Sequence, residues 1–451
     1  MDHFEYRDGR LWCEDCEMSA LAARFGTPLY VYSSATLTRH YERLRDAFAA
    51  LDPLICFSVK SCSNLHVLRL LAGLGAGLDV VSGGELARAR LAGVAPEKIV
   101  YAGVGKSDAE IISALGRPEE HEPAPMQTGP IGLFNVESEQ EFQTIAGLAE
   151  GVGVKARAAL RVNPDVDPVT HKYTTTGKAE TKFGVDLSRA RAFFKRYDGN
   201  PFLKLSGIHI HLGSPVASVG PYVQAVEKVV ALVDELEAGG HRIDTLNLGG
   251  GFGADYVTGQ SLDAAAYAGA IVPLLKDWLE ARWARTGRKT RVVLEPGRTI
   301  AASAGVLLSR VEYVKTSGSK KFLVCDAGMH TLIRPSLYEA FHFIWPANVA
   351  PMHEPAARVE RPDMPALEAC DVVGPICETG DFLAKDRPLP PVARGDLLGV
   401  FTAGAYGMSM ASRYNSHPLP AEVLVEGSSA RLIRRRESYA DLVEHEISPE
   451  E

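Results

Sequence analysis

The feature that most constrains the fold of this chain is an alternation of two kinds of segment between residues 50 and 300. Short β-branched apolar runs predict buried strands, and the Ala- and Leu-rich segments between them have the apolar spacing of helices. The eight expected strands are residues 55–59, 78–82, 99–104, 132–136, 159–162, 207–212, 245–248 and 292–295. Eight strand–helix units over about 250 residues are typical of a TIM barrel, which is favoured over an open, doubly wound sheet.

The pattern changes after about residue 305, where strand-like runs follow one another between Gly and Pro turns. These runs are residues 305–314, 321–325, 397–401 and 421–425. They predict a mostly β, sandwich-like second domain. Residues 27–32 also read as a strand and are expected to pair with that domain. We therefore expect a barrel over residues 34–305 and a β-rich domain formed by residues 1–33 and 306–451.

Three segments are expected at the surface of the molecule. Residues 117–130 and 346–365 are rich in Pro, Glu and His, which is typical of exposed insertions. The charged final residues, 434–451, are expected to form a surface helix followed by a loose tail.

Composition and charge exclude several classes of protein. Hydrophobic residues at 46% and charged residues at 23% are ordinary for a globular chain. The net charge of −8 is spread along the chain, without the basic stripe that nucleic acid or an anionic membrane would need. There is no apolar run of about 18 residues and no apolar signal segment after the first charges. Seven cysteines, an odd number in a long chain, argue against a disulfide framework, so we expect a cytoplasmic protein.

Polar side chains and glycines follow six of the eight expected strands. Because a TIM barrel carries its active site at the carboxyl ends of its strands, we expect these groups to meet on one face. They are Lys60, Asp79, Arg161, Asn163, His209, His211, Ser214, Gly249, Gly250, Gly251, Gly253, Glu295 and Arg298.

Four kinds of group in this set have the chemistry that pyridoxal phosphate requires. A lysine such as Lys60, desolvated at the mouth of a barrel, can attack an aldehyde. Gly250 and Gly251 let backbone N–H groups approach a phosphate closely. The carboxylate of Glu295 can keep a proton on the ring nitrogen, and an imidazole such as that of His211 can cover the ring face. Taken singly, each group also has an ordinary structural explanation, as a loop lysine, a turn, an ion pair or a core histidine.

The histidines leave a second interpretation open. His209 and His211 are two residues apart on one strand, so their rings point to one side, which suits the metal ion of a hydrolase. The remaining strand ends supply no further histidine, and we therefore expect no metal site. Cys13 and Cys16 form a C-x-x-C pair, but no second pair or nearby histidine completes a zinc site.

The motifs as a series resemble the ornithine/diaminopimelate/arginine decarboxylase family, fold type III pyridoxal phosphate enzymes with the alanine-racemase type of barrel. The resemblance covers nearly the whole chain, from TPLYVY to the RRRES tail. Its most distinctive motifs are FSVKSCSN, GLDVVSGGEL, GIHIHLGS, LNLGGGFG, LEPGR, DAGMHTLIRPSLYEAFH and VVGPICETGDFLAKDRPLP. The resemblance implies a pyridoxal phosphate cofactor, a barrel followed by a β-sandwich domain, and a homodimer whose active sites are shared between chains.

Carried over motif by motif, the resemblance implies a role for each site residue. Lys60 would bond to the aldehyde of the cofactor, His211 would stack on its ring, and Cys377 would donate a proton. Cys377 and Glu378 would enter the site from the partner chain. The residues implied to bind the cofactor are Lys60, Asp79, Arg161, His211, Ser214, Gly250, Gly251, Glu295 and Tyr406. The residues implied to bind the substrate are Arg298, Arg334, Tyr338 and Glu378.

Within the family, the resemblance favours decarboxylation of meso-2,6-diaminopimelate to L-lysine and CO2, the last step of lysine biosynthesis. The distal end of this substrate carries an ammonium and a carboxylate, which two arginines, a tyrosine and an acidic residue would complement. The alternatives are a decarboxylase of ornithine, arginine or carboxynorspermidine, and a catalytically silent relative that binds a partner protein. A silent relative would be expected to lack Lys60, Cys377 or the glycines, and all of them are present.

Overall fold

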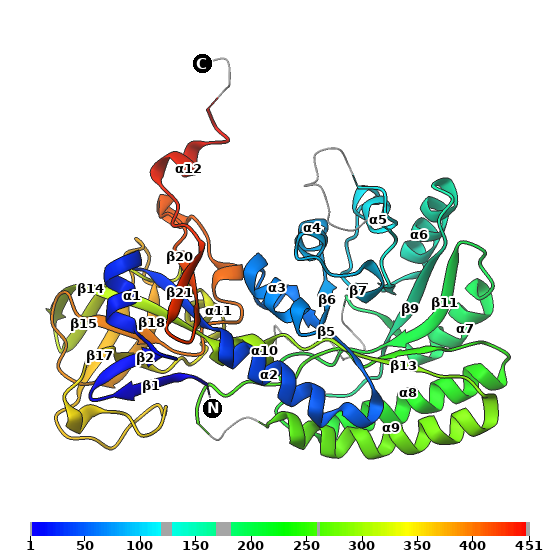
Figure 1. Cartoon of the computed structure of the whole chain (residues 1–451), viewed down its shortest axis with the longest axis horizontal. Helices are drawn as coiled ribbons and strands as arrows, with labels where there is room; N and C mark the ends of the chain where they lie inside the picture. Colours follow the sequence, from blue (N-terminus) through cyan, green and yellow to red (C-terminus); the bar gives the residue numbers. More distant parts are fainter. Residues whose placement is uncertain (1, 119–128, 168–181, 259–261, 448–451) are drawn as a thin grey trace. The chain divides into compact units, whose positions relative to one another are not determined.

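The computed structural model describes residues 2–118, 129–167, 182–258 and 262–447. The chain divides into two compact units (Figure 1). The barrel unit consists of residues 40–253 and 262–299, and the sheet unit of residues 1–39, 254–261 and 300–451. The expected domain limits, 34–305 against 1–33 and 306–451, stay a prediction.

Parallel strands of the barrel unit close on themselves. They are β5 (Leu54–Ser58), β6 (Gly77–Val80), β7 (Ile99–Tyr101), β8 (Leu133–Val136), β9 (Ala156–Asn163), β11 (Leu203–His209), β12 (Thr245–Asn247) and β13 (Arg291–Leu294). β13 pairs with β5 and β8 with β9, which completes the ring, while the short β10 (Val185–Asp186) adds to β9. Each of the eight expected strands overlaps one of these, so the TIM barrel is confirmed and the open sheet is wrong.

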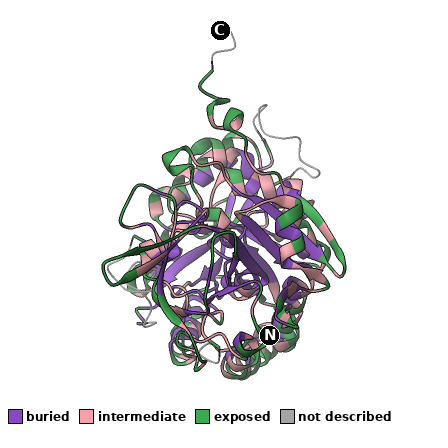
Figure 2. Ribbon diagram, turned by 90° about the vertical axis from the view of Figure 1, so that its left-hand side faces the viewer, coloured by how far each residue is buried: buried purple, intermediate pink, exposed green. Residues whose placement is uncertain are grey.

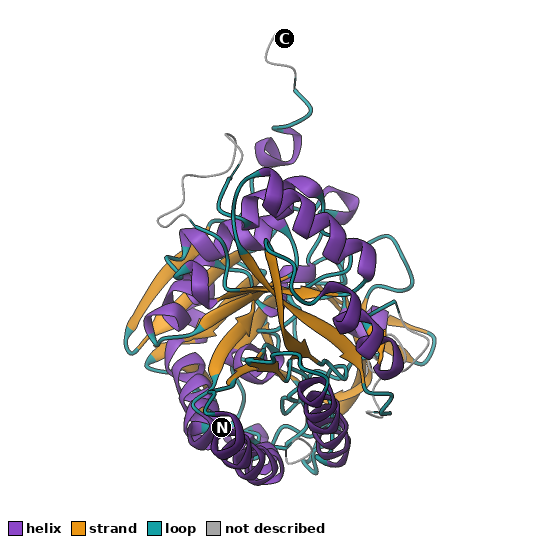
Figure 3. Cartoon of the chain, turned by 90° about the vertical axis from the view of Figure 1, so that its right-hand side faces the viewer, coloured by secondary structure: helices purple, strands orange, loops and turns teal. Residues whose placement is uncertain are grey.

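Helices surround these strands (purple around orange in Figure 3). They are α3 (Leu65–Gly73), α4 (Gly83–Leu91), α5 (Asp108–Ala114), α6 (Glu139–Gly151), α7 (Leu187–Tyr197), α8 (Gly220–Ala238) and α9 (Ala264–Thr286), with α2 (Ser34–Ala47) ahead of β5. Side-chain caps start several of them: Asn64 accepts from the His66 N–H, and Ser107 forms a capping box with Glu110. Of the described helices, none is both long and apolar enough to cross a membrane.

The strands are buried on both faces, as in other parallel sheets covered by helices (purple in Figure 2). A cluster of buried apolar side chains joins five strands: Cys56, Val100, Leu133, Ala159 and Val293. Polar residues occur inside the barrel mainly at the carboxyl ends of the strands, and these ends form what we call the barrel mouth.

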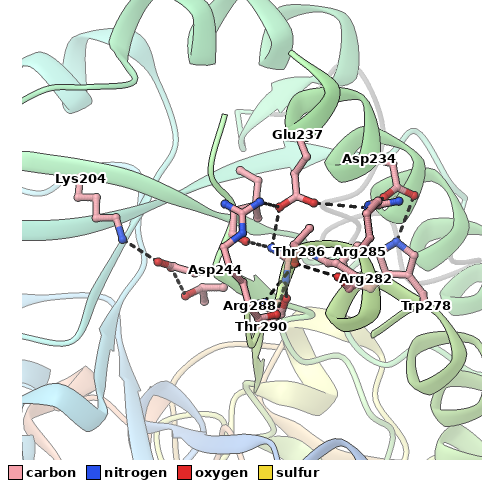
Figure 4. Close-up of polar contacts among 12 residues, drawn as sticks. Lys204, Asp234, Glu237, Asp244, Trp278, Arg282, Arg285, Thr286, Arg288 and Thr290 are labelled. Carbon is pink, nitrogen blue, oxygen red and sulfur yellow. Dashed lines mark hydrogen bonds and ion pairs between the residues drawn. The ribbon is translucent and has the colours of Figure 1, made fainter. Parts of the chain in front are cut away.

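At the opposite, amino end of the barrel strands, a buried ion pair joins α8 and α9 (Figure 4). Arg282 donates to Glu237 at 2.6 Å and to the Thr290 hydroxyl at 2.5 Å, and it also contacts the Ile243 carbonyl. Arg288 adds a second contact to Glu237 at 3.2 Å. Ile243 and Thr290 precede β12 and β13, so this cluster ties the two longest helices to the starts of two strands.

We expect Arg282→Ala to lower the free energy of unfolding by about 3–5 kcal/mol, because Glu237 would keep a buried charge without its main partner. The control is Arg285→Ala, which removes an exposed arginine from the same cluster and should cost no more than about 1 kcal/mol. Urea unfolding of the two variants measures the difference. Equal losses would contradict a special contribution from the buried pair.

The sheet unit is mostly β, as expected. Its strands are β4 (Leu29–Ser33), β14 (Gly305–Ser317), β15 (Lys320–Cys325), β16 (Ile344–Pro346), β17 (Glu368–Val373), β18 (Phe382–Leu389), β19 (Leu397–Val400), β20 (Ala421–Glu426) and β21 (Ser429–Arg434). β4 pairs antiparallel with β14 and parallel with β20, which confirms the expected pairing of the N-terminal run. A separate small sheet holds β1 (Phe4–Arg7), β2 (Arg10–Cys13) and β3 (Cys16–Glu17). The helices are α1 (Met18–Phe25), α10 (Arg298–Ala301, which starts in the barrel unit), α11 (Arg334–Tyr338) and α12 (Tyr439–Val443).

The expected insertions have different outcomes. Residues 119–128 of the first lie outside the described residues. The second, 346–365, is only partly exposed, and the expectation of an exposed insertion is wrong for its middle. There His353 is buried, because its carbonyl accepts from the Trp345 indole at 2.9 Å and its ring contacts the Pro365 carbonyl at 2.9 Å. The expected surface helix near the C-terminus is α12.

Candidate active site

A lysine and a buried carboxylate meet at the barrel mouth. Lys60 follows β5 in a short 3-10 turn, and its Nζ lies 2.8 Å from Oδ2 of Asp79 on β6. The Lys60 side chain is 34% exposed, whereas that of Asp79 is fully buried. Ser58 donates to the same Oδ2 at 2.7 Å, and Oδ1 of Asp79 has no hydrogen-bond partner among the described residues. Burial raises the pKa of Asp79, and the Lys60 amine opposes this.

A second carboxyl group lies in the first turn of α4, the helix that follows β6. Glu85 accepts from the Val81 N–H at 2.8 Å. Burial raises the pKa of Glu85 to about 7, and the charge of Asp79 adds to this effect. The barrel mouth therefore holds a carboxyl group with a pKa near neutrality. The charge of Asp79 raises this pKa and the charge of Lys60 lowers it.

Glu295, directly after β13, is a buried carboxylate held by three side chains. Its Oε1 accepts from the amides of Asn135 at 2.9 Å and Asn247 at 2.6 Å, and its Oε2 lies 3.3 Å from Nε2 of His209. Burial alone would raise the pKa of Glu295, but His209, Lys60 and the Asn247 amide together hold it well below its usual range. The interior of the barrel mouth thus contains a carboxylate that stays ionised.

His211, just beyond β11, presents a neutral ring. Its Nδ1 accepts from the Gly250 N–H at 3.1 Å, which places the ring hydrogen on Nε2 in the neutral form. Burial lowers the pKa of His211 well below its usual range, and the positive charges of Arg161 and Lys60 lower it further. The ring is therefore uncharged at physiological pH.

The glycine turn after β12 packs its backbone directly against neighbouring strand ends. A Cβ at Gly250 would lie 2.1 Å from the Glu295 carbonyl oxygen, and one at Gly251, whose φ is +102°, would lie 2.4 Å from the Gly213 carbonyl. Ser214 directly follows Gly213, and its hydroxyl accepts from Nε of Arg298 at 3.1 Å. Backbone N–H groups, a hydroxyl and a guanidinium are the groups that bind a phosphate.

Arg161, on β9, is already paired within the protein. Its Nη1 lies 2.7 Å from Oε1 of Glu137, and both side chains are buried. The other oxygen of Glu137 accepts from the Gly184 N–H at 2.7 Å. This pair fixes the ends of β8 and β9 relative to each other.

The other expected site residues belong to the sheet unit. Arg334 and Tyr338 begin and end α11, and Tyr406 has a left-handed backbone with φ of +56°. Cys377 and Glu378 are both exposed, and Oε2 of Glu378 accepts from the Tyr414 hydroxyl at 2.8 Å. The roles that the sequence predicts for these five residues stay predictions.

The sequence did not point us to several residues of the barrel mouth. Asn135 and Asn247, which hold Glu295, are the amide residues of the strands LFNV and TLN. A lone amide at the carboxyl end of a barrel strand was therefore the available signal. Glu85 stands inside the motif GLDVVSGGEL, and Glu137 directly follows an expected strand.

The barrel mouth suits pyridoxal phosphate. It has an amine for the aldehyde, an ionised carboxylate for the ring nitrogen, a neutral ring for the face and a glycine turn for the phosphate. The buried Oδ1 of Asp79 is an acceptor still to be satisfied. Within the described ranges, no group of three or more His, Cys, Asp or Glu side chains could hold a metal ion, so the geometry offers the hydrolase alternative no ligand set.

Comparison with known proteins shows the family to which this chain is similar. Residues 34–302 match the family described as "Pyridoxal-dependent decarboxylase, pyridoxal binding domain". A diaminopimelate decarboxylase of Aquifex aeolicus is 46% identical over 98% of this chain and 97% of its own length. The diaminopimelate decarboxylase of Pseudomonas aeruginosa is 44% identical over 98% of this chain and 98% of its own length. A solved structure of a diaminopimelate decarboxylase from M. jannaschii, in complex with L-lysine, is similar in fold, with a TM-score of 0.87 and 35% sequence identity. The similarity covers all of this chain and 98% of the chain in that structure.

Proposed function

Because this chain belongs to the pyridoxal-dependent decarboxylases, we propose that it decarboxylates meso-2,6-diaminopimelate to L-lysine and CO2, the last step of lysine biosynthesis. One observation carries the proposal. A lysine amine and a buried, ionised carboxylate lie at the mouth of a barrel whose full-length relatives, 40–46% identical, are diaminopimelate decarboxylases. Pyridoxal phosphate, when bound, withdraws electrons from the α-carbon of an amino acid, so that its carboxylate can leave as CO2.

Three residues would set the chemistry at the two ends of the cofactor ring. Lys60 supplies the amine that bonds to the aldehyde, and Asp79, 2.8 Å away, can take up and return a proton at Nζ. Glu295 would keep a proton on the ring nitrogen, because its own pKa is too low for it to take that proton away.

The remaining barrel residues would bind and orient. The neutral ring of His211 would cover the face of the cofactor without adding charge there. Gly250 and Gly251 offer backbone N–H groups to the phosphate, and Ser214 offers its hydroxyl, with Tyr406 assisting. Arg161 acts through its charge, which contributes to keeping His211 neutral.

The substrate would be recognised by its distal end, which carries a carboxylate and an ammonium. Arg298, Arg334 and Tyr338 bind the carboxylate through charge-assisted and hydroxyl hydrogen bonds. Glu378 binds the ammonium, and Cys377 donates a proton to the α-carbon. Ornithine would leave the two arginines without a carboxylate.

We further propose a cytoplasmic homodimer in which Cys377 and Glu378 each complete the site of the partner subunit. The exposure of both side chains on the single chain supports this arrangement, since it leaves them accessible to a second copy.

A substrate panel tests the function. We expect kcat/KM for meso-diaminopimelate to exceed that for L-ornithine or L-arginine by at least about a hundredfold, because a substrate without a distal carboxylate would not form the charge-assisted hydrogen bonds to Arg298 and Arg334. Release of L-lysine and CO2 measures turnover. A preference for ornithine, arginine or carboxynorspermidine would replace the proposed substrate, and activity lost on metal chelation would support a hydrolase instead.

A further inference from the structure

The guanidinium of Arg334 is fixed by two aromatic side chains of the sheet unit. Arg334 is buried at the start of α11, and its Nη1 lies 2.8 Å from Nε2 of His342. The guanidinium carbon lies 4.6 Å from the centre of the Tyr256 ring. The rings of Tyr256 and His342 meet edge to face, with their centres 5.4 Å apart. These contacts define both the position and the plane of the guanidinium.

The hydrogen bonds of His342 determine its tautomer. Its Nδ1 lies 2.9 Å from the Phe401 carbonyl oxygen, which can only accept, so Nδ1 must carry the ring hydrogen. A guanidinium can only donate, so Nε2 must be the acceptor for Arg334. The ring is completely buried, and Arg387 fixes its backbone by donating to the His342 carbonyl at 2.8 Å. His342 is thus a neutral ring anchored on one side and facing Arg334 on the other.

We propose that His342 is a positioning residue that orients Arg334 for the carboxylate distal to the reacting carbon. This inference rests on the proposed function, which assigns Arg334 to that carboxylate. The imidazole occupies one donor of the guanidinium and adds no negative charge, so this contact leaves the positive charge of Arg334 for the substrate. Because the guanidinium plane is already set, less ordering is needed when the carboxylate binds.

Two substitutions separate the two sides of the ring. In His342→Gln, the side-chain oxygen can take the place of Nε2 and accept from Arg334, while the contact with Phe401 is lost. In His342→Asn, the side-chain amide can take the place of Nδ1 and donate to Phe401, while the acceptor for Arg334 is lost. We expect His342→Asn to raise KM for meso-diaminopimelate about tenfold or more with a smaller change in kcat. His342→Gln should stay within about threefold of wild type.

Selectivity provides the second measurement. The ratio of kcat/KM for meso-diaminopimelate to that for L-ornithine should fall in His342→Asn, because only the first substrate has a distal carboxylate. The visible absorbance of the bound cofactor should be the same in both variants and the wild type. Equal rises in KM in both variants, or no rise in either, would overturn the proposal and leave His342 a structural residue.

Two further results keep the test decisive. If His342→Asn does not fold, 15N NMR of histidine-labelled wild-type protein, with the His342 signal assigned by its loss in His342→Gln, reads the tautomer. An imidazolium or a hydrogen on Nε2 would overturn the proposal. The wild type is assayed first: failure on meso-diaminopimelate defeats the proposed function and this inference with it. Normal wild-type turnover with unaffected variants defeats this inference alone.

Discussion

Replacing Lys60 by alanine is expected to lower kcat by at least about a thousandfold and to remove the visible absorbance of the bound cofactor. Lys60 supplies an amine at the barrel mouth that is both partly exposed and within 2.8 Å of a buried carboxylate. Without it, no group in its place can bond to the aldehyde. Absorbance spectra and steady-state rates of the purified protein measure the two effects.

A matched variant, Lys60→Arg, separates the contribution of the nucleophilic amine from that of its positive charge. Lys60→Arg keeps a positive charge beside Asp79, but a guanidinium is not a nucleophile, so the variant should be as inactive as Lys60→Ala. Lys276→Ala, which removes an exposed lysine from α9, should leave both the spectrum and the rate unchanged. Retention of the cofactor absorbance in Lys60→Arg would contradict the assignment of Lys60.

Lys60→Ala also tests the proposal that the active site is shared between two subunits. Mixing Lys60→Ala with Cys377→Ala in equal amounts should produce heterodimers with one intact site of two. Random exchange of subunits then restores activity to about a quarter of that of the wild type. A mixture that stays inactive after subunit exchange would contradict the supply of Cys377 by the partner subunit.

The sequence predicts the barrel and its mouth because both depend on local pattern. Each strand of the barrel is a short apolar run, and parallel closure brings the residues after those runs to one end. Lys60, Asp79, His211 and Glu295 therefore fall together without any knowledge of their contacts. A rule about strand ends is enough to place them on one face.

The contacts that give these residues their properties could not be read in the same way. Glu295 stays ionised because Asn135, Asn247 and His209 surround it, and these come from three other strands far apart in sequence. Which amide reaches which oxygen depends on the register of the closed barrel. Likewise, Glu137 pairs with Arg161 across two strands, so its partner is defined only by the fold.

The insertion at 346–365 shows that the composition of a segment does not determine which of its residues are buried. Its composition indicates an exposed loop, and Met352 is indeed exposed. His353 beside it is buried because backbone carbonyls satisfy its ring and the Trp345 indole. Composition measures the average polarity of a segment, whereas burial depends on whether each polar atom finds a partner.

Neutralising Glu295 is the second change from which we expect a large effect. In Glu295→Gln, the amide oxygen can still accept from Asn135 and Asn247, so the shape of the site is kept. The substitution removes the negative charge that we propose holds a proton on the ring nitrogen. We expect kcat to fall by about a hundred- to a thousandfold, while the cofactor remains bound.

This pattern differs from that of Lys60→Ala, in which absorbance and activity disappear together. Asn247→Ala removes one of the two amide donors but keeps the carboxylate, so it should lower kcat by only about tenfold. Titration of absorbance with added pyridoxal phosphate measures cofactor affinity in each variant, and the rate at saturating cofactor measures kcat. If Glu295→Gln lost the cofactor as well, or if its kcat matched that of the wild type, Glu295 would be a structural group rather than the partner of the ring nitrogen. If kcat at full cofactor occupancy instead falls in the order wild type, Asn247→Ala, Glu295→Gln, the rate depends on the negative charge of Glu295 inside the barrel.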